Sequence, residues 1–402
     1  MPPQQPPFKT IVIIGAGPIG LTTAYALHHV SSDFLLEQRP TIIEDNGASL
    51  VIYPHTLPIM HQFGLLDAIL SVSGELKHHL SFTADGHIFN EGARYACVRE
   101  NHGHAPIVLH RAELIQILYE GLPTTTESKI HTNEDVINIL RHPNGVSVLC
   151  ADSSIYPSTM IIGADGVHSR PRRIMRDIAL QENPSRSWDP AQPFASPYQL
   201  LYGSFPAIWQ PGQGYDVQDQ DRAIILPRET SNRVWYTEED IEALGHDFAE
   251  FPSTRTMKVK DIWPGMQGIG MTNLEEGIVR HWHLGRVVLV GDACHKMTTH
   301  LGLGFNNEVQ DVVVLCNGLW RGVFEAYEEV RKSRACSLTA DVGNAGLETR
   351  MHTWRNTVYY GISRLVDWLI SLELRKGRVL GYILREEVMR GGMSWVYPMD
   401  TI

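Results

Sequence analysis

The chain of 402 residues lacks most features that mark secreted, metal-binding or nucleic-acid-binding proteins. Its five cysteines are odd in number and have no metal-ligand spacing, which argues against a disulfide framework and for a reducing compartment. The histidines form no HExxH motif, so we expect no metal. A net charge of −11 is the opposite of the basic footprint of a nucleic-acid binder. No secretory signal, repeat or low-complexity region is recognised beyond the proline-rich start.

Long hydrophobic runs are also missing. The least polar late segment, Asn356–Leu374, contains Arg364, Asp367 and Glu373 and is therefore a poor membrane span. Four basic residues after it could meet a membrane surface, although a solvated helix face is the more common arrangement: Arg375, Lys376, Arg378 and Arg385. We expect a cytoplasmic protein, either free or peripheral to an intracellular membrane.

A glycine-rich turn near the N-terminus predicts a dinucleotide site. Ile11–Ile14 is a β-branched run typical of a strand buried on both faces, and a Gly-x-Gly-x-x-Gly motif follows it before a helix. Gly15 allows the tight turn, Gly17 lets the backbone approach a pyrophosphate, and Gly20 lets helix and strand pack closely. Glu37 ends the second strand, where its carboxylate can accept both ribose hydroxyls. This pattern favours an adenine dinucleotide over a plain tight turn.

Two later segments also run from a buried strand into a polar turn. The first ends at Asp165 and Gly166 and is followed by basic residues, so it can pair with polar groups and phosphates. The second ends at Gly291 and Asp292, and Asp292 is well placed to accept hydrogen bonds from a sugar-like polyol chain. The helix predicted from Asn306 to Leu319 would present backbone N–H groups and positive partial charge to an anionic ring edge.

Taken together, the three segments resemble the group A FAD-dependent monooxygenases over most of the chain. The segments Asp292–Met297 and Gly302–Asn307, with Trp354, are similar to the fungal paxilline-epoxidase type. The resemblance implies cofactor-binding roles for Gly15, Gly17, Gly20, Glu37, Gly47, Ala48, Arg111, Asp165, Gly166, Gly291, Asp292, Gly304 and Phe305.

The resemblance also implies an activity. FAD, bound tightly but not covalently, would be reduced by NADPH or NADH, and a flavin C4a-hydroperoxide would carry oxygen from O₂ to the substrate. The expected substrate is a hydrophobic natural-product scaffold of terpenoid, meroterpenoid or indole type, which is epoxidised or hydroxylated in secondary metabolism. Two alternatives stay open: an FAD-dependent oxidoreductase or cyclase without oxygen insertion, and a redox-inactive binding or escort protein.

The expected fold is α/β. A Rossmann-type FAD-binding domain comprises residues 1–175 and 277–345, an inserted, mostly antiparallel β-sheet domain for substrate comprises 176–276, and a helical segment comprises 346–402. Tyr198, on a strand entering the inserted domain, could point its phenol at the substrate, although packing within the sheet is the competing interpretation. His295 is better explained by packing under the flavin loop than by catalysis.

Several positions depart from the family pattern. Thr299 stands where proline is usual, Leu303 where glutamine is common, and Phe305 where a small residue is common, all on the expected flavin face. The chain is also short between Trp235 and Tyr236, and a missing strand there would reshape the substrate sheet. Basic residues after the second motif are either attractors for the nicotinamide or a solvated helix face: Arg170, Arg172 and Arg173.

Overall fold

A computed structural model describes most of the chain. The described residues are 10–28, 32–44, 49–92, 94–123, 129–205, 212–219, 222–223, 225–227, 235–297, 299, 302–319, 324–333 and 335–336. Gly47, Ala48 and the predicted helical segment 346–402 lie outside these ranges.

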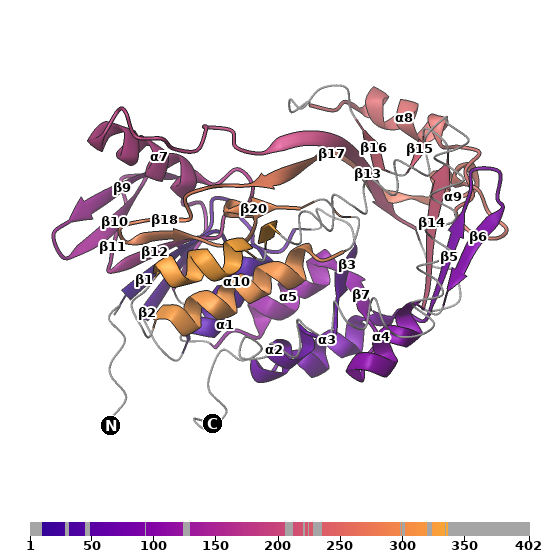
Figure 1. The fold of residues 1–402 in the computed structure, drawn as a ribbon, viewed down its shortest axis with the longest axis horizontal. Coiled ribbons are helices and arrows are strands. Elements are labelled where there is room, and N and C mark those ends of the chain that lie inside the picture. The colour runs from indigo at the N-terminus through magenta and orange to yellow at the C-terminus, as the bar shows by residue number, and fades with distance from the viewer. Residues whose placement is uncertain are drawn as a thin grey trace.

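A mostly parallel sheet carries the dinucleotide motif (Figure 1). Its strands in spatial order are β18 (His283–Leu284), β19 (Val287–Leu289), β12 (Met160–Gly163), β1 (Thr10–Ile14), β2 (Ser32–Leu36) and β8 (Ile130–His131). β1 pairs in parallel with β2 and β12, and β12 pairs in parallel with β19. Three strands far apart in the sequence therefore end at one edge of the sheet. The predicted return of the chain to this sheet after the insertion is confirmed.

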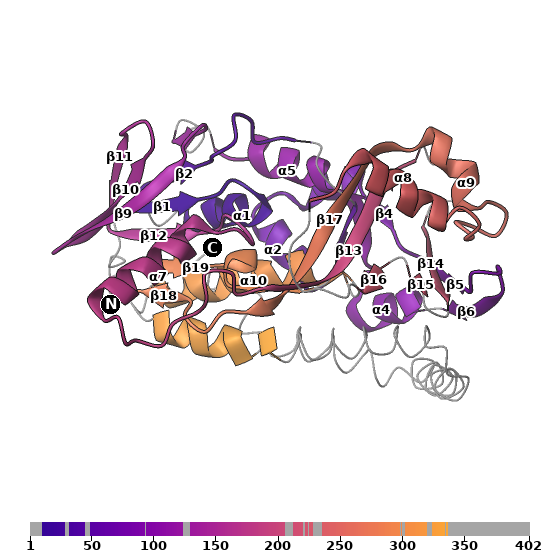
Figure 2. The same cartoon turned by 90° about the horizontal axis from the view of Figure 1, so that it is seen from above.

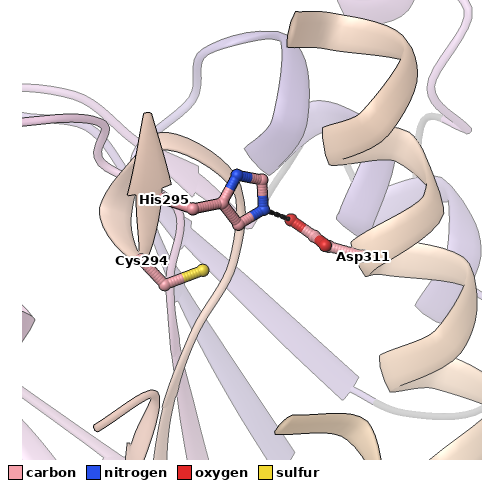
Figure 3. A group of neighbouring side chains, drawn as sticks. All are labelled: Cys294, His295 and Asp311. Atoms are coloured by element: carbon pink, nitrogen blue, oxygen red, sulfur yellow. Dashed lines mark hydrogen bonds and ion pairs between the residues drawn. The ribbon is translucent and has the colours of Figure 1, made fainter. Parts of the chain in front are cut away.

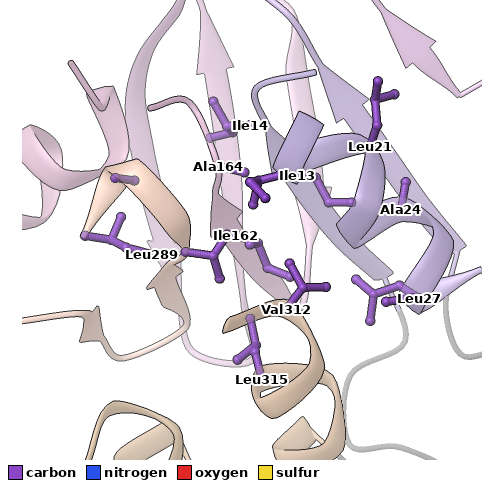
Figure 4. Close-up of a cluster of buried hydrophobic side chains, with 14 of the residues drawn as sticks. Ile13, Ile14, Leu21, Ala24, Leu27, Ile162, Ala164, Leu289, Val312 and Leu315 are labelled. Carbon is purple, nitrogen blue, oxygen red and sulfur yellow. The ribbon is translucent and has the colours of Figure 1, made fainter. Parts of the chain in front are cut away.

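Helices α1 (Pro18–Leu27), α5 (Arg111–Glu120) and α10 (Gly304–Leu319) lie together on one face of this sheet (Figure 1). Ile13 and Ile162 from the strands meet Leu21, Leu27 and Val312 from α1 and α10 in the main core (Figure 4). The strands are apolar on both sides because a covered parallel sheet has no solvent face. This packing fixes the positions of the ends of β1 and β12 and of the N-termini of α1 and α10.

The remaining sheets are mostly antiparallel. The turn residues His142–Gly145 are typical of a hairpin, and β9 and β10 pair across them. One sheet contains β9 (Val136–His142), β10 (Gly145–Cys150) and β11 (Ile155–Ser158), and another contains β3 (Ser49–Ile52), β7 (Ile107–His110) and β4 (Gly74–Glu75).

Two further sheets form the other half of the molecule, where β13 and β17 run side by side as long strands (Figure 2). The first contains β16 (Ile225–Pro227), β13 (Ala195–Ser204), β17 (Gln267–Ile278) and β20 (His295–Lys296). The second contains β15 (Arg222–Ala223), β14 (Gln213–Asp219), β5 (His78–Phe82) and β6 (Ile88–Gly92). β14 runs parallel to β5, so this sheet also takes strands from the segment assigned to the FAD-binding domain. The α/β fold class is confirmed, while the domain boundaries stay a prediction.

Helix α7 (Arg170–Glu182) follows the second motif directly. Its N-cap is Ser169, whose Oγ accepts the Arg172 N–H at 3.2 Å. The apolar residues between Leu57 and Leu70 lie on two helices, which are separated near Gly64 with φ of +75°. The other helical elements are α2 (Leu57–Gln62), α3 (Leu66–Val72), α4 (Arg94–His102), α8 (Glu238–Asp247), α9 (Val259–Ile262), the 3₁₀ turns Trp263–Gly265 and Gly291–Ala293, and residues 324–333. Within the described ranges, none of the helices has the length and apolar character needed to cross a membrane.

Candidate FAD site

The glycine-rich turn between β1 and α1 contains two kinds of glycine. Gly15 has φ of +104°, and a methyl group there would lie 2.7 Å from the carbonyl oxygen of Ala164. A methyl group at Gly20 would collide with the carbonyl oxygen of Gly15. At Gly17, by contrast, a methyl group would meet nothing within 4 Å. Gly15 and Gly20 are therefore required by packing, whereas Gly17 borders open space at the N-terminus of α1, where an anion is favoured.

Glu37 follows β2 and is held beside this turn. Its Oε2 accepts the N–H of Ala16 at 2.7 Å, and Arg39 donates to both carboxylate oxygens at 3.0 and 3.1 Å. Burial raises the pKa of Glu37, but the bonds from Arg39 and Ala16 outweigh it, so the net pKa is lowered. The carboxylate is therefore ionised at neutral pH, and a ribose would share it with Arg39 and Ala16.

Asp165 lies just after β12, in the turn that includes Gly166 with φ of +79°. Its Oδ2 accepts the N–H of Arg170 at 2.7 Å, but its Oδ1 is buried and has no hydrogen-bond partner within the described residues. Burial raises the pKa of Asp165 to about 6. A buried, unpaired carboxyl oxygen is costly, so a ligand hydroxyl that donates to Oδ1 would relieve that cost. The unpaired oxygen of Asp165 therefore suits a cofactor that carries several hydroxyl groups.

Arg172 connects the second motif with the third. Its guanidinium donates to the carbonyl oxygens of Val167 and Ala293 and lies 4.8 Å from the ring centre of Phe194. Only 7% of the residue is exposed. Both interpretations of Arg172 are therefore wrong: it is neither a solvated side chain nor a free attractor for the nicotinamide. It is a buried bridge between two turns.

The third motif is a short 3₁₀ turn that follows β19. Gly291 has φ of +63°, which a residue with a side chain rarely adopts. Asp292 forms an ion pair with Lys296, and about a quarter of its side chain is exposed. Asp292 thus lies at the carboxyl end of a strand next to the one that leads to Asp165, and it remains accessible.

A buried polar cluster supports this turn (Figure 3). Oδ2 of Asp311, on α10, accepts the Gly291 N–H at 3.0 Å and lies 2.6 Å from Nε2 of His295. Oδ1 of Asp311 accepts Nε of Arg331 at 2.7 Å. His295 is 1% exposed, in agreement with a packing role under the loop. Cys294, His295 and Asp311 are close enough to share a metal ion, yet Arg331 already supplies a cation to this carboxylate.

The start of α10 is fixed by Asn306. Its Oδ1 accepts the N–H of Tyr53 at 2.8 Å, and its Nδ2 donates to the carbonyl oxygens of Val51 and Gly302 at 2.8 and 3.1 Å. These bonds join the helix to β3. Sequence reasoning assigned no role to Asn306, Asp311 or Arg331. Only the family motif that contains Asn306 could have drawn attention to one of them.

Two predicted positions near the helix start are apolar packing sites. Phe305 is 7% exposed and its ring belongs to the main core, and its role at the flavin face stays a prediction. Leu303 packs in a small cluster with Tyr53 and Val98. Gly304 is the first residue of α10, two residues earlier than predicted.

Other predicted residues are less defined. Arg111 begins α5 directly after β7, and its exposed side chain has no ion-pair partner in the described part of the chain. Tyr198 lies in β13, where its backbone is opposite Leu274 of β17. The roles of both residues stay predictions.

The predicted residues nevertheless converge. The carboxyl ends of β1, β2, β12 and β19 bring the glycine-rich turn, Glu37, Asp165 and Asp292 to one edge of the parallel sheet. Open α/β sheets bind ligands at this edge. The N-termini of α1 and α10 follow the first and third of these motifs, which adds backbone N–H groups and positive partial charge.

Comparisons with known proteins identify the family. The family model described as an FAD binding domain matches residues 9–188 and 218–332. The FAD-dependent monooxygenase srdH of Neurospora crassa is 31% identical over 77% of this chain and 75% of its own length. The FAD-dependent monooxygenase DEP2 of Fusarium langsethiae is 31% identical over 79% of this chain, which spans only 64% of that relative.

The fold has solved counterparts. The crystal structure of p-nitrophenol 4-monooxygenase PnpA from Pseudomonas putida matches with a TM-score of 0.74 at 15% identity, over 94% of this chain and 98% of that one. At this identity the likeness concerns the fold. The family model and the fungal relatives also identify the family, and the geometry of the turns fits FAD. The chain belongs to the FAD-dependent monooxygenases, and FAD is its cofactor.

Proposed function

We propose that this protein uses NADPH or NADH and O₂ to epoxidise or hydroxylate a hydrophobic natural-product scaffold, of terpenoid, meroterpenoid or indole type, in fungal secondary metabolism. The observation that carries the proposal is the convergence of Gly17, Glu37, Asp165 and Asp292 at one edge of the parallel sheet. The fungal relatives named FAD-dependent monooxygenases support the reaction class.

Each of these residues has a distinct task in the proposal. Backbone at Gly17 and the start of α1 would receive the pyrophosphate, and Glu37 would hold the adenosine ribose. Asp165 and Asp292 would accept hydroxyl hydrogen bonds. The first turn of α10 would face the ring with its N–H groups, where an electron-rich reduced ring is stabilised electrostatically. When bound, FAD supplies the redox and oxygen-transfer chemistry.

The substrate is proposed to lie against β13 and β17. Tyr198 lies on β13 and is the candidate to orient a polar group of the substrate. The apolar cluster of Tyr53, Val98 and Leu303 suits a substrate with little polarity. We also propose that the protein acts in the cytoplasm, with peripheral attachment to an intracellular membrane as the other outcome of a fractionation experiment.

An isotope experiment tests the reaction. Purified protein with FAD and NADPH is supplied with candidate scaffolds under ¹⁸O₂, and one labelled oxygen atom per product molecule is expected by mass spectrometry. An unlabelled product would instead identify an oxidoreductase or cyclase. Protein that is colourless and gains no absorbance near ~450 nm with added FAD would identify a redox-inactive binding protein.

A further inference from the structure

Glu308 lies where the third motif meets the start of α10. A methyl group at Gly291 would lie 3.0 Å from one carboxyl oxygen of Glu308, and a methyl group at Gly304 would lie 3.6 Å from the other. The carboxyl group is thus enclosed between the two elements proposed to face the ribityl chain and the ring of FAD. No motif in the sequence marks this residue.

Three charged side chains face Glu308. Asp292 of the 3₁₀ turn and Lys296 of β20, its ion-pair partner, both act electrostatically on the Glu308 carboxyl group. Asp311 lies on the same helix, but its carboxylate already binds His295 and Arg331. One lysine therefore faces two neighbouring carboxyl groups.

Two adjacent carboxyl groups repel each other when both are ionised, so one of them tends to keep its proton. Glu308 is half-buried, and burial together with Asp292 raises its pKa well above the ordinary value even though Lys296 opposes the rise. The ion pair of Lys296 is made with Asp292 and not with Glu308. Glu308 is therefore the member of the pair that holds a proton.

We propose that Glu308 and Asp292 share one proton, and that Glu308 is a positioning residue that donates it to Asp292 and so orients this carboxylate toward the ribityl chain. Lys296 holds Oδ2 of Asp292 through an ion pair. This inference rests on the proposed placement of FAD at Asp292. With one shared proton, Glu308 and Asp292 together carry one negative charge instead of two when the anionic cofactor binds.

A dependence on pH follows. When the pair loses its proton, Asp292 gains a second negative charge beside it and loses its donor, so FAD should bind more weakly. The affinity should fall by up to about tenfold per pH unit above the pKa of the pair, because one proton is involved. Glu308→Gln keeps a donor that cannot ionise and should bind FAD without this fall. Glu308→Ala has no donor and no titratable carboxyl group, so it should bind more weakly than the wild type below the pKa of the pair and should not show the fall above it.

The experiment measures FAD dissociation constants of the full-chain apoprotein by flavin fluorescence, from about pH 6 to about pH 9. The control is Glu239→Gln, which removes an exposed carboxyl group on α8. It should follow the wild-type curve. The inference is overturned if Glu308→Gln keeps the wild-type slope, or if it binds as poorly as Glu308→Ala at low pH.

A second measurement needs no variant. Calorimetric titration of wild-type apoprotein with FAD in two buffers of different ionisation enthalpy counts the protons bound. Proton uptake that rises with pH toward one per FAD is expected, and zero uptake throughout this pH range overturns the inference while leaving the proposed function intact. Wild-type protein that fails to bind FAD at any pH would overturn the proposed site as well.

Discussion

The two glycines that flank the start of α1 should respond in opposite ways to the same substitution. Gly20→Ala places a methyl group against the carbonyl oxygen of Gly15, so the helix must move away from the strand. Gly17→Ala places a methyl group where no atom lies within 4 Å. The first change should damage the fold, and the second should damage only the site.

The magnitudes follow from these contacts. At Gly20 the obstacle is backbone rather than a flexible side chain, so the loss should reach or exceed the upper end of overpacking costs, about 3 kcal/mol. Gly17 is the N-cap of α1 with φ of −72°, which alanine can adopt, and the loss there should be at most about 1 kcal/mol. A methyl group in the path of the pyrophosphate should nevertheless weaken FAD binding at least about tenfold, or about 1.4 kcal/mol.

Urea denaturation of the apoproteins and flavin titration separate the two effects. Gly17→Ala should unfold near the wild-type midpoint and bind FAD weakly, whereas Gly20→Ala should unfold at a clearly lower urea concentration. If Gly17→Ala binds FAD as tightly as the wild type, the open space beside this residue is not where the pyrophosphate lies. If Gly20→Ala is as stable as the wild type, the close packing argument is wrong.

Three further predictions concern buried charge. Asp311→Asn disrupts the ion pair with Arg331 and should lower the free energy of unfolding, measured in urea, by about 3–5 kcal/mol. The exposed control Asp177→Asn should change it by less than about 0.5 kcal/mol. A loss below about 1 kcal/mol for Asp311→Asn contradicts the prediction. Burial raises the folded-state pKa of Asp165 to about 6, so apoprotein stability should fall as pH rises from about 4 to about 6. Thermal denaturation of Asp165→Asn should lack this fall, and an unchanged profile refutes the assignment. Arg172→Met should lower the free energy of unfolding by about 2–4 kcal/mol, because two buried carbonyl oxygens lose their donor. It should leave the KM for NADPH unchanged. A raised KM at normal stability would mean that Arg172 does attract the nicotinamide cofactor.

The sequence predicts those parts of the fold that depend on the residue types within one short segment. The β-branched run Ile11–Ile14 and the three glycines predict β1, the turn and α1, because a strand covered on both faces and a tight turn each restrict residue type. The hairpin between β9 and β10 follows from its turn residues in the same way. The edge of the sheet where the motifs meet was also foreseeable, since each motif follows a predicted parallel strand.

Other features depend on contacts that no local pattern contains. β14 pairs with β5 across more than a hundred residues of sequence, and no local pattern in either strand indicates this pairing. Arg172 stands in a basic run typical of a solvated helix, and only the approach of Val167 and Ala293 makes it a buried bridge. Phe305 belongs to the main core, which the motif alone does not indicate.

The polar residues of the first two turns of α10 have a common explanation in this packing. Asn306 binds β3, Asn307 accepts Nη2 of Arg331 at 2.9 Å through its carbonyl oxygen, and Asp311 binds both Gly291 and Arg331. The helix therefore joins three segments that are otherwise separate in sequence. Because its start is held from several sides, the N–H groups there keep one orientation before any ligand arrives. Preorganised donors of this kind stabilise charge without the cost of reorganisation, which is the property that a site for a reduced flavin requires.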